Sequence, residues 1–218
     1  VAAHLGHVLD GVRSLDDILI DAPGGFRLAP GGGGVARLAS LRLEEQERLA
    51  ARLQPLESDA DYLLIDCGAG LGPQVLSFIR FANAALIVTT PEPTAIADAY
   101  ALIKAAAHGA SSAAQFRPSL IVNQCDGEAE ALRVHRRIAA VCARFLDLDL
   151  PLMGWTPDDP MVRDAVRVRN PFVIEHPRCR AARRVRILAD ALIERFEPAP
   201  RNGRRHPRVL SRLIRLGR

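Results

Sequence analysis

The chain has 218 residues, of which 49% are apolar and 25% are charged, and its formal net charge is +4. This composition excludes a chain that is disordered throughout, because so many apolar residues can bury enough surface to offset the conformational entropy of folding. Its 29 basic residues are 28 arginines and a single lysine, Lys104, and no uncharged stretch reaches the ~18 apolar residues that a membrane-spanning helix needs.

The charge is unevenly distributed along the chain. Residues 1–174 carry 16 basic and 21 acidic side chains, whereas residues 175–218 carry 13 arginines and four acidic side chains. An acidic body argues against a nucleic-acid platform over the whole surface, while a basic C-terminal part is suited to a polyanion, either a lipid surface or a nucleic acid. A solvated arginine-rich helix is the simpler alternative for residues 178–195.

The first 60 residues contain few strong signals. Leu5 to Ile20 is predicted to be a helix that ends at the turn cluster 21–25, and Phe26 to Ala29 a short strand. The spacing of leucines over 41–53 predicts an exposed amphipathic helix. Four scattered cysteines with no CxxC pair predict reduced thiols in a cytosolic protein, at Cys67, Cys125, Cys142 and Cys179.

From residue 62 onward, short apolar runs alternate with helical patterns. Strands are predicted over 62–65, 84–88, 119–122 and 152–155, and helices over 71–79, 94–107, 128–145, 158–168 and 178–195, with Thr94 as an N-cap. Strands that are apolar throughout are covered on both faces, which predicts a mainly parallel sheet flanked by helices in an α/β fold. Ligands bind beyond the carboxyl ends of such strands, where the sequence places Asp66, Thr89, Thr90, Asn123 and Pro157.

Asp66 follows an apolar strand and precedes two glycines, Gly68 and Gly70. A strand end holds a carboxylate in place near Mg²⁺ and its waters, and glycines let backbone amides approach a phosphate without a Cβ in the way. On spacing alone, the same pattern also fits an ordinary turn.

Two longer segments carry a family resemblance. Residues 61–70, DYLLIDCGAG, and residues 87–104, IVTTPEPTAIADAYALIK, resemble the MinD/ParA family of deviant P-loop ATPases. The flagellar-number regulators of the FlhG-like branch look nearest, because Gly68 stands where MinD has proline and because the Pro-Glu-Pro-Thr helix start is typical of them. The resemblance covers nearly the whole chain and implies a P-loop NTPase fold of the MinD type.

The resemblance also implies roles for particular residues with ATP and Mg²⁺. Asp66 would be the catalytic aspartate that organises Mg²⁺ through a water molecule, with Gly68 and Gly70 in the phosphate-side loop and Gly70 beside the γ-phosphate. Asn123 would pair with adenine, and Pro157 and Asp158 would lie near its ring through their backbone. Without the resemblance, Asn123 is interpreted as a turn residue and Pro157 as the end of a loop.

The family's phosphate loop is rich in glycine and contains two lysines, one of them in Gly-Lys-[Ser/Thr]. The only lysine here, Lys104, lies in a predicted helix, and the glycines 31–34 have no lysine after them and are interpreted as a flexible turn. The chain as written is therefore not expected to bind ATP tightly or to hydrolyse it, although the full-length protein is expected to be an ATP hydrolase. Truncation at the N-terminus is the favoured explanation, with in-frame DNA upstream of Val1 encoding the loop; a degenerate relative is the alternative.

The C-terminal part is predicted to contain a linker and a short helix. Residues 1–195 form the nucleotide-binding domain, 196–207 a linker and 208–218 an amphipathic helix. At ~100° per residue, one arc of this helix is apolar and the opposite arc is basic. The apolar arc holds Val209, Leu210, Leu213, Ile214 and Leu216, and the basic arc holds Arg208, Arg212, Arg215 and Arg218 with Ser211.

Such a helix fits the headgroup region of an anionic membrane and resembles the membrane-targeting tail of MinD and FlhG-like proteins. Docking on the protein itself or on a partner is the alternative. The leading hypothesis is therefore an ATPase that is peripheral on the inner face of the plasma membrane, dimerises with ATP and cycles between membrane and cytoplasm. It would regulate flagellar number or placement, or the position of a division site or cargo, with a flagellar or polar protein partner.

Two other classes of function remain open. The first is a non-enzymatic adaptor of the same fold. The second is a ParA-like ATPase that binds DNA of any sequence through Arg178, Arg180, Arg183, Arg184 and Arg186. The apolar face of the C-terminal helix disfavours DNA binding, because DNA would leave that face in water.

Overall fold

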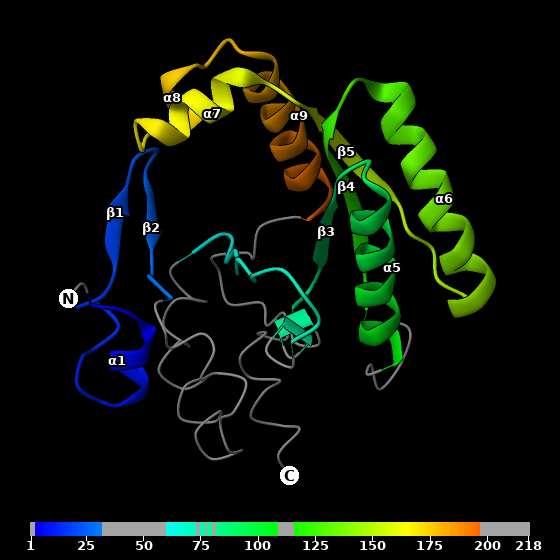
Figure 1. The fold of residues 1–218 in the computed structure, drawn as a ribbon. Coiled ribbons are helices and arrows are strands. Elements are labelled where there is room, and N and C mark those ends of the chain that lie inside the picture. The colour runs from blue at the N-terminus through cyan, green and yellow to red at the C-terminus, as the bar shows by residue number, and fades with distance from the viewer. Residues whose placement is uncertain are drawn as a thin grey trace. The chain divides into compact units, whose positions relative to one another are not determined.

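The computed structural model describes residues 3–31, 60–72, 75–76, 78–79, 82–108 and 116–196. The chain divides into two compact units, one of Val1–Ala82 with Pro198–Arg218 and one of Asn83–Glu197 (Figure 1). The second unit contains the parallel sheet and most of the buried side chains.

The sheet of the second unit has three parallel strands in the order β3–β4–β5. They are β3 (Ala85–Thr89), β4 (Pro118–Cys125) and β5 (Leu152–Pro157). The central strand β4 is the most deeply buried, and the side chains of Leu120 and Val122 have no exposed surface. The predicted parallel α/β sheet is therefore confirmed over these three strands.

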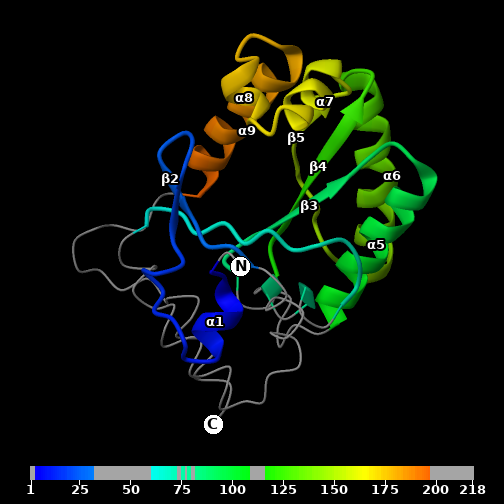
Figure 2. The same ribbon diagram turned by 60° about the vertical axis from the view of Figure 1, so that its left-hand side comes forward.

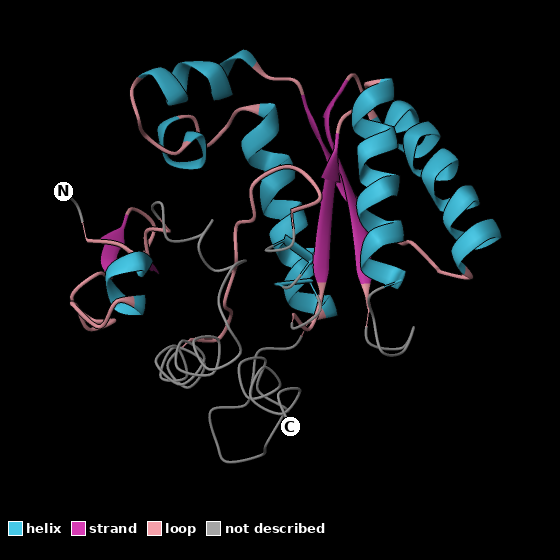
Figure 3. Cartoon of the chain, turned by 60° about the horizontal axis from the view of Figure 1, so that its bottom comes forward, coloured by secondary structure: helices cyan, strands magenta, loops and turns pink. Residues whose placement is uncertain are grey.

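Helices cover both faces of this sheet. On one face lie α5 (Pro93–His108) and α6 (Glu128–Leu146), which pack against each other, and on the other lies α9 (Arg180–Arg195), which packs against β5 (Figure 3). Each contributes small or branched apolar residues to the core, among them Ile103, Ile138 and Ala182. Two short helices, α7 (Pro160–Arg167) and α8 (Phe172–Glu175), lie beyond the carboxyl ends of the strands (Figures 1 and 2).

The start of α5 differs from the prediction by one residue, which changes the role of Thr94. The helix begins at Pro93, and the amide of Ile96 donates to the carbonyl of Glu92 at 3.0 Å. Proline suits a first helical position because its missing N–H would have no partner there. Thr94 therefore lies inside the first turn and is not the N-cap.

The helix predicted for Leu5 to Ile20 is wrong over most of its length. The structure has a five-residue helix, α1 (Leu5–Leu9), followed by Gly11 in the left-handed region with φ 73°. Ser14 and Asp17 then close a separate turn, in which the Asp17 amide donates to Ser14 Oγ and the Ser14 amide donates to Asp17 Oδ2. A glycine in the left-handed conformation ends a helix, and the spacing of apolar residues does not predict where such an end falls.

The segment after that turn forms an antiparallel hairpin. Its strands are β1 (Ile20–Ala22) and β2 (Phe26–Leu28), with Ile20 opposite Leu28. The predicted strand at Phe26 is thus confirmed, while Ile20 belongs to a strand and not to a helix.

The strand predicted over 62–65 is not formed. Residues 62–68 have no regular secondary structure, and Leu64 is 77% exposed. An apolar run becomes a strand only when a neighbouring strand pairs with its backbone, and no strand of the described residues does so here. In the second unit, Val88 of β3 is 59% exposed.

Two further predicted helices, over 41–53 and 208–218, lie outside the described residues, and so does nearly all of the predicted linker. Of the helix predicted over 71–79, residues 75, 76, 78 and 79 are helical. In the described part of the chain, no helix has both the length and the apolar character needed to cross a membrane.

Candidate functional site

Polar residues gather at the carboxyl ends of the three parallel strands. Thr89 ends β3 and is buried, Asn123 lies near the end of β4, and Pro157 ends β5. Thr90 follows β3, and its hydroxyl oxygen is buried without a hydrogen-bond partner among the described residues. This edge of the sheet is where α/β folds bind ligands, as the sequence predicts.

Asn123 is held by Thr156, a neighbour that no pattern in the sequence indicates. The hydroxyl of Thr156, a buried residue of β5, donates a hydrogen bond to Asn123 Oδ1. This contact fixes the orientation of the side-chain amide, whose nitrogen is the group that can donate to a ligand. Such a donor suits an acceptor atom on a ring, such as a purine nitrogen.

The backbone beside Asn123 is also unusual. Gln124 has φ 57°, and the pairing of β4 with β5 shifts register between Val122 and Cys125. Positive φ at a residue other than glycine is uncommon and is found often at functional sites. The irregularity interrupts the pairing at Asn123 before it resumes at Cys125 opposite Pro157, so Asn123 lies in a distorted part of the strand and not in an ordinary turn.

The loop after β5 contains two aspartates with different environments. Asp158 is exposed and forms an ion pair with Arg163, with 3.1 Å between Oδ1 and Nη1. Asp159 is buried and accepts from the amide of Met161 at 3.1 Å and from the amide of Ala181 at 3.0 Å. The second of these hydrogen bonds, together with that from Met161, lowers the pKa of Asp159 although burial acts in the opposite direction.

Asp159 therefore caps two helices with one carboxylate. Met161 lies in the first turn of α7, and Ala181 lies in the first turn of α9. The amides at a helix start have no partner within the helix, and a carboxylate satisfies them well. The Asp-Pro pair at the start of α7 is a helix-start signal in the sequence, but nothing in the sequence indicates the contact with α9.

The predicted phosphate-side residues belong to the other unit. Asp66, Gly68 and Gly70 lie in an exposed segment without regular secondary structure. Gly70 has φ 109°, which strongly favours glycine, whereas a Cβ at Gly68 would meet nothing within 4 Å. Burial raises the pKa of the adjacent Cys67 thiol, and the Asp66 carboxylate raises it further.

The structure thus brings together part of the predicted site. Asn123, Pro157 and Asp158 lie at neighbouring strand ends of one unit, and Cys125, just after Asn123, is opposite Pro157 in the ladder. Asp66, Gly68 and Gly70 lie together in the other unit. Among the described residues, no group of three histidine, cysteine or acidic side chains could hold a metal ion. An exposed lone carboxylate such as that of Asp66 suits Mg²⁺, which keeps several of its waters.

Several curated proteins are similar to this chain over most of its length. The antiactivator FleN of Pseudomonas aeruginosa is 32% identical over 204 residues, which cover 93% of this chain and 70% of FleN. An ATP-binding protein of Methanocaldococcus jannaschii is 30% identical over 87% of the chain, and the flagellum site-determining protein YlxH of Helicobacter pylori is 29% identical over 75%. The chain spans 66% and 54% of the lengths of these last two relatives.

Solved structures show the same fold. The cell division ATPase MinD of Pyrococcus furiosus superposes with a TM-score of 0.67 at 20% identity, covering 89% of this chain and 76% of that one. MinD of Pyrococcus horikoshii, solved with Mg-ADP, gives a TM-score of 0.66 at 21% identity, covering 88% and 74%. No model of a known protein family matches the chain. On its similarity to FleN and on this shared fold, the chain belongs to the MinD/ParA family.

Proposed function

We propose that the protein binds ATP with Mg²⁺ when it carries the family's phosphate loop, which this chain does not contain, and that it cycles between the cytoplasm and the inner face of the plasma membrane, regulating the number or placement of flagella. The observation that carries this proposal is the 32% identity to FleN over 93% of the chain. The similarity to YlxH, a flagellum site-determining protein, supports the same process. Similarity to several MinD proteins supports the alternative of a division-site regulator at lower coverage of the chain.

In this proposal the strand ends of the second unit hold the base. Asn123 donates its amide to an acceptor of the adenine ring, with Thr156 fixing the amide, and the backbone at Pro157 and Asp158 lies beside the ring. Asp66 would hold Mg²⁺ through a water molecule, and the metal would supply positive charge for the phosphates. Gly68 and Gly70 let the backbone approach the terminal phosphate, which the positive φ of Gly70 supports.

A genetic experiment tests the flagellar part of the proposal. Removing the gene from its host should change the number of flagella per cell, counted by electron microscopy, and the wild-type gene should restore it. Asp66→Ala should fail to restore it, because Mg²⁺ loses its carboxylate. Asp98→Ala, which removes an exposed carboxylate on α5, is the matched control and should restore it fully. Flagella that stay unchanged in the deletion strain would contradict the proposal.

A binding experiment tests the membrane part, which depends on residues 208–218. Leu213→Asp places a charge on the apolar arc of this segment and should lower co-sedimentation with vesicles containing 30% phosphatidylglycerol by about tenfold. Ser211→Asp adds the same charge to the basic arc and should have a much smaller effect. Equal binding by both variants would show that the segment does not lie on lipid.

Calorimetry with Mg-ATP, combined with the flagellar count, distinguishes the adaptor hypothesis. If the protein binds no Mg-ATP in calorimetry, yet Asp66→Ala still restores flagellar number, the function depends on partner binding and not on nucleotide. If the protein binds duplex DNA of any sequence more tightly than vesicles, the DNA-binding alternative replaces the membrane proposal.

A further inference from the structure

We propose that the second unit carries its own contact site for anionic lipid, separate from residues 208–218. The site, called here the α7–α9 patch, consists of exposed Val166, Val168 and Ile174 together with exposed Arg169, Arg183 and Arg186. This inference adds a second lipid contact to the proposed membrane cycling, and its choice of lipid as the partner rests on that proposed function.

The first argument is local charge. Residues 166–187 contain seven arginines and one glutamate, whereas the chain up to residue 174 is acidic overall. The single glutamate, Glu175, accepts a hydrogen bond from Asn170 at 2.6 Å. In the part of the chain that the structure describes, none of the three arginines of the patch forms an ion pair. The patch therefore presents positive charge without internal compensation.

The second argument is the position of these arginines on α9. Four arginines lie in the first seven residues of the helix, and its first turn holds no acidic residue. Arg184 has a clear structural role, because its guanidinium lies 4.0 Å from the centre of the Trp155 ring. Among the described residues, no aromatic ring lies under Arg183 or Arg186 and no carboxylate pairs with them, so both guanidinium groups are available to an anionic partner.

The third argument is the apolar content of the same surface. Val166 is 69% exposed, Val168 63% and Ile174 43%. Arginines next to exposed branched apolar side chains are typical of surfaces that lie in the headgroup region, where guanidinium groups meet phosphates and apolar groups reach the acyl boundary. A nucleic acid would contact the arginines but would leave the apolar side chains in water.

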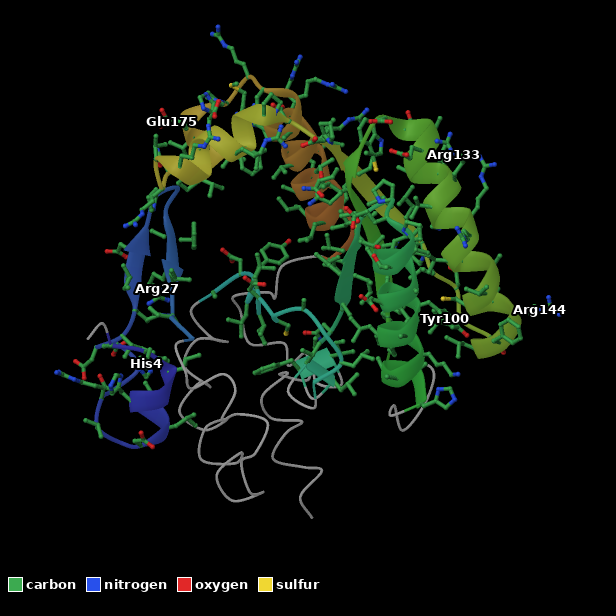
Figure 4. All side chains as sticks on the ribbon, in the orientation of Figure 1. His4, Arg27, Tyr100, Arg133, Arg144 and Glu175 are labelled. Atoms are coloured by element: carbon green, nitrogen blue, oxygen red, sulfur yellow. The ribbon has the colours of Figure 1, made fainter. Side chains whose placement is uncertain are left out.

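These residues lie on elements that neighbour one another in the second unit. The helix α8 packs against both α7 and α9, and Asp159 joins the starts of α7 and α9 by its two hydrogen bonds. Figure 4 shows Glu175 at the α7–α8 end of this unit, whereas Arg133 and Arg144 lie on α6. The helices α7 and α8 lie beyond the carboxyl ends of the strands (Figure 2), and α9, which carries Arg183 and Arg186, follows α8.

The patch and residues 208–218 can reach the same membrane. At the ~1.5 Å rise of a helix, Arg183 and Arg186 lie about 18 Å and about 14 Å along α9 from its last residue, Arg195. The 12 residues 196–207 can extend over at most about 40 Å. Two weak contacts joined in this way bind more tightly than either alone, by effective concentration.

Vesicle co-sedimentation of the full chain in ~150 mM salt tests the patch. Vesicles of phosphatidylcholine alone are compared with vesicles that contain 30% phosphatidylglycerol. Since each basic side chain near an anionic surface strengthens binding roughly fivefold, Arg183→Glu with Arg186→Glu should lower binding to the anionic vesicles at least about tenfold. Binding to the neutral vesicles should be weak for every variant.

The matched control is Arg136→Glu with Arg137→Glu, which makes the same change in net charge at two exposed positions of α6. Charges further than the ~8 Å screening length contribute little, so this control should lower binding less than about twofold. Equal losses in the two double variants would overturn the patch. Leu213→Asp weakens the contact made by residues 208–218. If Leu213→Asp lowers vesicle binding while Arg183→Glu with Arg186→Glu does not, this inference is overturned and the proposed function is left intact.

A second variant does not rely on charge reversal. Val166→Ser with Val168→Ser removes exposed apolar groups at little risk to folding and should lower binding to the anionic vesicles about fivefold. Thermal unfolding of each variant checks that it is folded. If the arginine variant loses affinity for a random-sequence DNA duplex while both variants keep vesicle binding, the patch is a nucleic-acid site and the lipid proposal is wrong.

Discussion

At the scale of single residues, Thr156 tests how Asn123 is positioned. Thr156→Val keeps the shape of the side chain but removes the hydroxyl that donates to Asn123 Oδ1. The free energy of unfolding should fall by about 1 kcal/mol, the usual contribution of one such hydrogen bond. Thr156→Ser keeps the hydroxyl, so the free energy of unfolding of this variant should fall less. Denaturation in urea measures both, and equal losses would mean that packing, not the hydrogen bond, is responsible.

Asp159 gives a prediction with a defined dependence on pH. Its hydrogen bonds lower its pKa below the ordinary 3.8, so its stabilising effect is full above that value and is lost as the pH falls through the lowered pKa. Asp159→Ala should destabilise the protein by about 2 kcal/mol at neutral pH, since two helix starts lose their cap. The difference in the free energy of unfolding from wild type should narrow as the pH falls below 3.8 and through the lowered pKa.

The neighbouring Asp158 is the control for this experiment. Asp158→Ala removes an exposed ion pair with Arg163, which contributes at most about 1 kcal/mol and is weakened by salt. Urea unfolding at several pH values compares the two variants. If the effect of Asp159→Ala is the same at every pH, its carboxylate is not the group that holds the two helices.

At the scale of elements, the contact between α9 and β5 depends on a glycine. A Cβ at Gly154 would lie 2.6 Å from Leu188 Cδ2, which is closer than atoms approach. Gly154→Ala should therefore force Leu188 to move and lower the free energy of unfolding by about 1–3 kcal/mol. Leu188→Ala leaves room for the new Cβ, so the double variant should be more stable than the sum of the single losses predicts. Strict additivity in urea unfolding would contradict this contact.

Much of the element structure of the second unit could be predicted from sequence. The strand predicted over 84–88 is observed over Ala85–Thr89, and the helix predicted over 128–145 is observed as Glu128–Leu146. These segments have long, regular patterns and pack within one unit, so local pattern and tertiary contacts agree. In the first unit, the predicted helix does not reach Ile20, because Gly11 ends it early. The predicted strand over 62–65 does not form, because this apolar run lacks a pairing strand among the described residues.

At the scale of the whole molecule, the four thiols report on folding. None forms a disulfide, and Cys125 and Cys142 are buried while Cys67 and Cys179 are half-buried. Burial, with smaller effects from Glu130 and Asp126, raises the pKa of Cys125 to about 11, so at pH 8 roughly one molecule in a thousand carries its thiolate. A thiol reagent should therefore modify the half-buried Cys67 and Cys179 before the buried Cys125 and Cys142 in the native chain, and all four in denaturant. Four rapid modifications in the native protein would contradict the described core.

The sequence by itself determined the parallel α/β class, most elements of the second unit, and the family, because buried strands, helix periodicity and the motif around Asp66 are local patterns. It also showed that 28 arginines accompany a single lysine. Only the tertiary structure decided that Thr156 holds Asn123 and that Asp159 caps two helices. These are contacts between residues distant along the chain, up to 33 positions apart for Thr156 and Asn123, and no local pattern specifies which distant partners meet.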